Sequence, residues 1–113
     1  MLDHPFRLPT ISADEALLRV RDGAVLIDLR KPPAVLASGN RVAGALIRDP
    51  YVFGHSDPLT HSDAPLITFC VHGHEVSQFA CALLMLHGRD ACYVSGGYEA
   101  LVAAGAVLED IAE

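Results

Sequence analysis

Basic side chains are scarce in this sequence. It contains 8 lysines and arginines against 14 aspartates and glutamates, which gives a formal charge of -6 over 113 residues. Because the cations are scattered, they form no basic stripe that would neutralise phosphates, and we exclude nucleic acid and anionic membrane surfaces as partners. An anionic substrate would therefore need positively charged groups or hydrogen-bond donors at its own binding site.

Long apolar runs and disulfide-forming cysteines are also few. No stretch reaches the roughly 18 apolar residues that span a bilayer, and the N-terminus carries Asp3, His4 and Pro5 where a signal peptide has an apolar core. The 3 cysteines are an odd number, which argues against a secreted disulfide framework and leaves at least one thiol free. These absences predict a cytoplasmic protein without a membrane span.

Apolar residues, by contrast, are abundant. They make up 51% of the chain and charged residues only 19%, the reverse of the composition of disordered proteins. The length is typical of one domain with its own core. We therefore expect residues 1–113 to form a single domain that folds by itself.

The order of apolar runs predicts an α/β fold. Short continuous runs indicate buried strands at residues 24–27, 44–47, 66–69 and 91–94. Helical spacing indicates helices at 14–22 and 77–87, with one or two closing helices over 98–104 and 107–112. The prolines after residue 30 indicate a loop, and residues 48–65 lack periodicity, which predicts a long loop with one helical turn. This alternation predicts a central, mostly parallel sheet of about five strands with helices on both faces.

Cys70 stands at the end of one of these predicted strands. A loop follows it and leads to a helix for which Ser77 is the expected N-terminal cap. Backbone N–H groups converge in such a loop, and the helix end adds about half a positive charge, so a thiolate is favoured there. Gly73 permits a positive φ and leaves room for a ligand. Cys70 is therefore the candidate nucleophile.

Four short segments resemble the rhodanese (thiosulfate sulfurtransferase) family in its small single-domain form. They are LIDLR at residues 26–30, GA at 44–45, CVHG at 70–73 and GGYEA at 96–100, in the family's order. The resemblance extends from about residue 10 to residue 101. It implies that Cys70 accepts a sulfane sulfur as a persulfide and passes it to a thiophilic acceptor, which is covalent catalysis with ping-pong kinetics.

The resemblance also implies the rest of the site. The donor would be thiosulfate or a persulfide, and the acceptor a thiol, cyanide or a protein, with neither a cofactor nor a metal. Asp28, Arg30 and Ser77 would support the site, and for the first two we favour an ion pair that fixes the loops at the strand ends. The substrate-binding loop would consist of Val71, His72, Gly73, His74, Glu75 and Val76.

Two alternatives to a sulfurtransferase remain. A non-catalytic or redox-regulatory rhodanese-like module would use the same loop to bind a partner. A phosphatase-like or arsenate-reductase-like enzyme would fit a loop of seven residues from Cys70 to Val76, but those families end the loop with an arginine. Here Val76 takes that position, and Glu75 would repel a dianion if it faced the pocket. The phosphatase alternative is therefore the weaker one.

The remaining chemistry-bearing residues have simpler interpretations. Cys81 lies within a predicted helix and Cys92 within a buried strand, so both are expected to be packing residues. His72 and His74 are proton donors, cationic substrate contacts or solvated loop residues, and Glu75 is expected to point to water. The pattern Cys-x-His-x-His at residues 70–74 lacks the second ligand cluster that tetrahedral metal sites require, so no metal is predicted.

Overall fold

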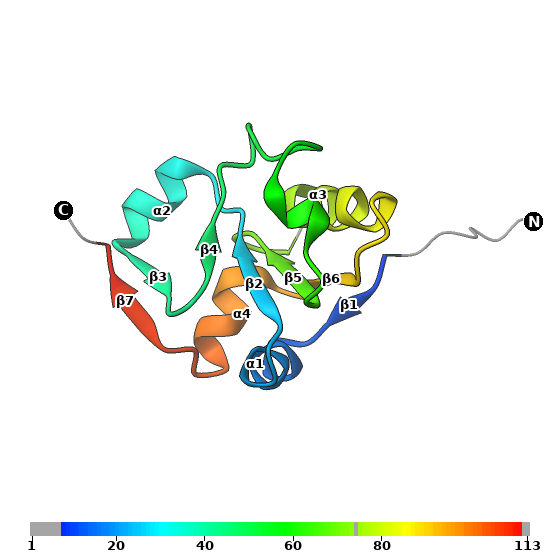
Figure 1. The fold of residues 1–113 in the computed structure, drawn as a ribbon. Helices are drawn as coiled ribbons and strands as arrows, with labels where there is room; N and C mark the ends of the chain where they lie inside the picture. Colours follow the sequence, from blue (N-terminus) through cyan, green and yellow to red (C-terminus); the bar gives the residue numbers. More distant parts are fainter. Residues whose placement is uncertain (1–7, 74, 112–113) are drawn as a thin grey trace, which may run out of the picture.

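The computed structural model describes residues 8–73 and 75–111. Its central sheet has five strands in the order β1-β6-β5-β2-β4, and every neighbouring pair is parallel (Figure 1). This confirms the predicted α/β class. The five strands are β1 (Thr10–Ile11), β2 (Val25–Asp28), β4 (Leu46–Ile47), β5 (Leu66–Phe69) and β6 (Ala91–Val94).

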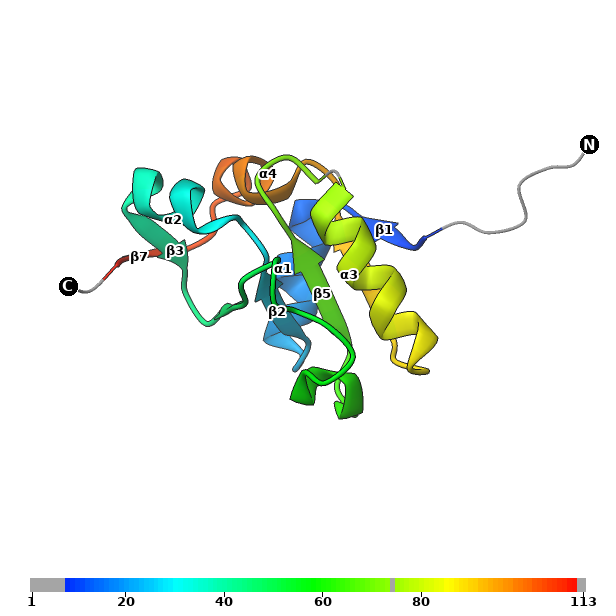
Figure 2. The same ribbon diagram turned by 90° about the horizontal axis from the view of Figure 1, so that it is seen from above.

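Helices cover both faces of this sheet, as predicted (Figures 1 and 2). Helices α1 (Ala13–Arg21) and α4 (Gly97–Ala103) pack on one face, and α3 (Glu75–Leu86) packs on the other. Successive strand residues point to opposite faces. In β5, Ile67 and Phe69 therefore join the α1 and α4 core, while Leu66 joins the α3 core.

The pairing of β2 with β5 determines where the site lies. Their register sets Asp28 beside Phe69, so both strands end at the same level of the sheet. Residues 29–31 and Cys70, which follow these two ends, are thereby brought together. Ligand sites in open α/β sheets occur at this carboxyl edge.

Two expectations about local structure were wrong. The helix predicted over 107–112 is not formed by residues 107–111, and residue 112 lies outside the described residues. Instead, β7 (Leu108–Asp110) pairs antiparallel with β3 (Asn40–Val42), because the closing segment runs back along that short strand. The segment after β2 is not only a loop, since α2 (Pro32–Ser38) begins there. Proline suits the first helical position, where its missing N–H would have no helical partner. Gly39 ends α2 in the left-handed conformation, with φ +73°.

Predictions for the first helix and for the segment after β4 agree with the structure. Ser12 caps α1 by accepting a hydrogen bond of 3.1 Å from the backbone N–H of Glu15. The long segment between β4 and β5 contains a single turn of 3-10 helix, η1 (Pro58–His61). Among the helices of the described residues, none combines the length and apolar character that crossing a membrane requires.

Candidate active site

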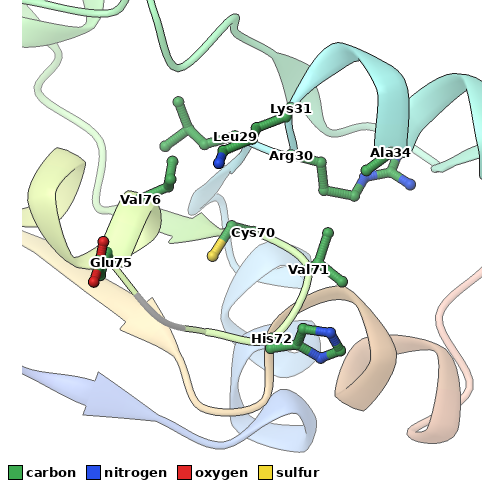
Figure 3. A pocket seen from close by; sticks show the side chains of 9 residues that line it. All are labelled: Leu29, Arg30, Lys31, Ala34, Cys70, Val71, His72, Glu75 and Val76. Atoms are coloured by element: carbon green, nitrogen blue, oxygen red, sulfur yellow. The ribbon is translucent and has the colours of Figure 1, made fainter.

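Cys70 lies at the base of a pocket of about 450 Å³ (Figure 3). It is the first residue after β5, and only 8% of its surface is exposed. Its Sγ lies 3.3 Å from the hydroxyl oxygen of Ser77 in α3. A hydroxyl at this distance accepts from the neutral thiol, and by turning it can donate to a thiolate. The sulfur is thus positioned by a polar neighbour and faces a cavity.

The loop after Cys70 is shorter than expected. Helix α3 begins at Glu75, so Glu75 and Val76 form its first turn and belong to the helix rather than to the loop. Ser77 is not the cap: it is fully buried inside the helix and faces Cys70. An acidic residue is favourable in a first helical turn because of the helix dipole, which accounts for the earlier start. His74 lies outside the described residues.

Two glycine-containing segments fit closely against each other beneath Cys70. The amide of Tyr98 donates a hydrogen bond of 2.7 Å to the carbonyl of Cys70. A Cβ on Gly73 would lie 2.8 Å from the nitrogen of Gly96, and one on Gly97 would collide with the carbonyl oxygen of Cys70. Both glycines also have positive φ. The Gly-Gly pair at 96–97 therefore supports the Cys70 loop by backbone contact.

Arg30 and Asp28 form a buried ion pair beside the pocket. Arg30 is 2% exposed and Asp28 is fully buried, with 2.8 Å between Nη2 and Oδ2. The other donors of the guanidinium reach the hydroxyl of Ser38 and the carbonyl of Asn40, each at 3.0 Å. Its Cζ lies over the ring of Tyr98, 4.2 Å from the ring centre. These contacts of the arginine hold together the segments around the end of β2.

The charged groups that face the pocket come from two sides. Lys31 and Glu75 both line it and are exposed, and His72 lies at its rim, 3.7 Å from the carboxylate of Glu99 (Figure 3). Lys31 is a pocket residue that was not among those predicted; its signal is its position directly after the Asp-x-Arg segment at a strand end. The full lining consists of Leu29, Arg30, Lys31, Ala34, Cys70, Val71, His72, Glu75 and Val76.

Of the predicted site residues, most therefore come together around one cavity. Three stand behind its lining: Gly73 is buried against residues 94–97, Asp28 holds Arg30, and Ser77 holds Cys70. Within residues 8–73 and 75–111, no three His, Cys, Asp or Glu side chains gather closely enough to hold a metal ion.

The other two cysteines lie in the core. Cys81 is fully buried, and burial raises the pKa of its thiol to about 12. Cys92 is 6% exposed, and burial raises its pKa as well. Both therefore remain neutral thiols at physiological pH, which is the form that packs in an apolar core and is the less nucleophilic one.

Known proteins are similar to this chain in sequence and in fold. No family model matches it. The chain is 36% identical over 94 residues to the thiosulfate sulfurtransferase GlpE of Pseudomonas putida (strain F1), covering 82% of this chain and 81% of the relative. It is 34% identical over 90 residues to the GlpE of Pseudomonas entomophila (strain L48), covering 79% and 80%. A rhodanese-related protein from Thermoplasma volcanium has the same fold, with a TM-score of 0.73 at 17% identity over 89% of this chain and 97% of that one.

Proposed function

This chain belongs to the rhodanese (thiosulfate sulfurtransferase) family, and on that premise we propose that it transfers a sulfane sulfur through a persulfide on Cys70. The observation that carries the proposal is the position of Cys70. Its sulfur follows a buried strand, contacts the hydroxyl of Ser77 at 3.3 Å and faces a pocket large enough for a small donor. A cysteine that only packs in the core, such as Cys81, does not line this pocket.

The first half of the reaction loads the enzyme. The Cys70 thiolate attacks the outer sulfur of thiosulfate, the S–S bond of the donor breaks, and sulfite leaves with the bonding electron pair. A persulfide donor reacts in the same way and releases a thiolate. The Ser77 hydroxyl donates a hydrogen bond to the attacking thiolate. The ammonium of Lys31, which lines the pocket, attracts an anionic donor.

The second half returns the enzyme to its starting state. An acceptor thiolate or cyanide attacks the outer sulfur of the Cys70 persulfide, and the electron pair of the broken S–S bond returns to Sγ. Both halves exchange one sulfur between nucleophiles, so no external oxidant or reductant is required.

The arrangement of cations supports sulfur transfer over phosphoryl transfer. In the phosphatases considered above, the arginine that ends the loop stabilises the transferred phosphoryl group by bidentate contacts. The guanidinium of Arg30 is bonded to Asp28, Ser38 and Asn40, and the position where phosphatases carry arginine is Val76. The pocket therefore suits a donor of lower charge density.

Mass spectrometry of the intact protein and its peptides tests this function. After incubation with thiosulfate, or separately with glutathione persulfide, we expect a gain of one sulfur on the peptide that contains Cys70. Cys70→Ala should abolish the gain, while Cys92→Ala, which also removes a buried thiol, should retain it. An unmodified Cys70 with both donors in a folded protein would contradict the enzyme and favour the binding-module alternative.

A further inference from the structure

The pocket around Cys70 continues into a second lobe. This lobe has a volume of about 310 Å³ and shares Leu29, Lys31, Glu75 and Val76 with the first. Figure 3 shows Leu29, Val76 and Glu75 on one side of Cys70, opposite Val71 and His72. The two lobes therefore meet along that side. A donor such as thiosulfate, with five heavy atoms, leaves the second lobe empty.

The walls of the second lobe are mainly apolar. Phe53 and Ala80 form buried parts of it, whereas Tyr51 is 72% exposed and Phe79 is 66% exposed. Together with Pro50, these residues create an aromatic cleft on the surface of a chain that carries a net charge of -6. Concave sites with apolar walls and few polar groups are typical of small-ligand binding. Exposed aromatic rings beside a reactive thiol thus point to a ligand that covers them.

We propose that this second lobe binds the apolar arm of a low-molecular-weight thiol that accepts sulfur from Cys70. The proposal rests on the proposed function, which it extends by naming the class of acceptor. The acceptor would carry an aromatic or aliphatic group, in contrast to cyanide or a short hydrophilic thiol.

The helix α3 sets the length of the arm. Ser77 contacts the reactive sulfur, and Ala80 lies in the second lobe three residues further along the helix. Along the helix axis, Ser77 and Ala80 are about 4.5 Å apart, because the α-helix rises about 1.5 Å per residue. A spacer of two methylenes between the acceptor sulfur and its apolar group spans this distance.

The charges at the junction favour a neutral arm. Lys31 and Glu75 both line the two lobes, so one positive and one negative side chain flank the passage between them. Neither sign of charge on the arm gains a net advantage there. Apolar contact with Phe79 and Tyr51 is then the main source of selectivity.

The transfer step balances without an added redox partner. The acceptor thiolate RS⁻ attacks the outer sulfur of the Cys70 persulfide. A bond forms between the acceptor sulfur and that outer sulfur, and the bond between Cys70 Sγ and the outer sulfur breaks. The products are RSSH and the Cys70 thiolate. In ping-pong kinetics, kcat/KM for the acceptor reports only this half-reaction, so the choice of donor does not enter.

The experiment compares 2-phenylethanethiol with ethanethiol as acceptors of the preformed Cys70 persulfide. We expect the phenyl compound to have about tenfold higher kcat/KM, since partial burial of an aromatic group corresponds to a factor of this order. Phe79→Ala should reduce this ratio to about two or less. Leu86→Ala removes a side chain from the same helix that is 81% exposed and outside the lobe, and it should keep the ratio.

Each outcome bears on one proposal. If the persulfide does not form with any donor, the proposed function fails before the acceptor is added. If the persulfide forms but the two thiols react equally, or if Phe79→Ala and Tyr51→Ala both leave the ratio unchanged, the second lobe is not the acceptor site. Rapid transfer to a protein thiol with no preference between the small thiols would also overturn the proposal.

Discussion

Gly73→Ala should destabilise the protein more than Gly88→Ala, although both glycines have the same φ. Each has φ +77°, so alanine meets the same left-handed strain at both positions, about 1–2 kcal/mol. A Cβ at residue 88 meets nothing within 4 Å, whereas one at residue 73 would lie 2.8 Å from the nitrogen of Gly96 and 2.8 Å from the carbonyl oxygen of Val94. Both neighbours are backbone atoms, which cannot rotate away.

The difference between the two variants isolates the cost of this contact. Forcing backbone segments apart typically costs about 1–3 kcal/mol. We therefore expect the free energy of unfolding to fall by about 1–2 kcal/mol for Gly88→Ala and by about 2–5 kcal/mol for Gly73→Ala. Urea unfolding followed by circular dichroism measures both, because the chain has no tryptophan for fluorescence.

Reactivity provides a second measurement on the same pair. The contact holds the loop that begins with Cys70, so Gly73→Ala should slow persulfide formation on Cys70 by at least about tenfold, which corresponds to about 1.4 kcal/mol. Gly88→Ala, at the far end of α3, should leave that rate unchanged. Equal stability of the two variants would show that the loop yields freely, and our account of residues 73 and 96 would be wrong.

Three other predictions concern thiols and charge. Iodoacetamide at neutral pH should label Cys70 much faster than Cys81 or Cys92, because burial raises the pKa of the latter two; equal labelling would contradict the assignment. The raised pKa of Cys81 stabilises the fold fully below the unfolded value of 9.0, and this contribution is lost as pH rises to about 12. The wild type should therefore lose more of its free energy of unfolding than Cys81→Ala across that range in pH-dependent urea titrations. Glu75→Arg should raise and Lys31→Glu should lower kcat/KM for thiosulfate, each by about threefold to tenfold at low salt. Changes in the same direction would place one of the two side chains away from the donor.

Local signals predicted the part of the site that lies on one continuous segment. The apolar run at 66–69 and the helical spacing that follows it both correspond to observed elements, and together they place Cys70 at a strand end facing α3. The start of α3 was misplaced because serine is a common cap. Here the Ser77 hydroxyl is used for a contact with Cys70 instead.

Long-range pairing accounts for what sequence patterns did not reveal. Lys31 enters the pocket only because β2 and β5 end at the same level, and the pairing of β3 with β7 joins segments nearly seventy residues apart. The aromatic walls at residues 51 and 53 belong to a stretch without periodicity, so nothing local indicates which way they face. Contacts of this kind depend on the assembled sheet rather than on any one segment.

The contacts of Arg30 supply the physical argument for the proposed preference of this pocket for sulfur over phosphate. Its Nε and Nη2 bond to the buried carboxylate of Asp28, its Nη1 bonds to Ser38, and its face lies over Tyr98. The charge of this guanidinium is therefore balanced before any substrate arrives. Among the described residues that line the pocket, the other Lys or Arg side chain is Lys31, whose ammonium is exposed, and Glu75 lines the same cavity. With one positive and one negative side chain lining it, the pocket offers a compact dianion little net electrostatic attraction. A polarizable sulfur donor with diffuse charge has a lower desolvation cost on entering the pocket.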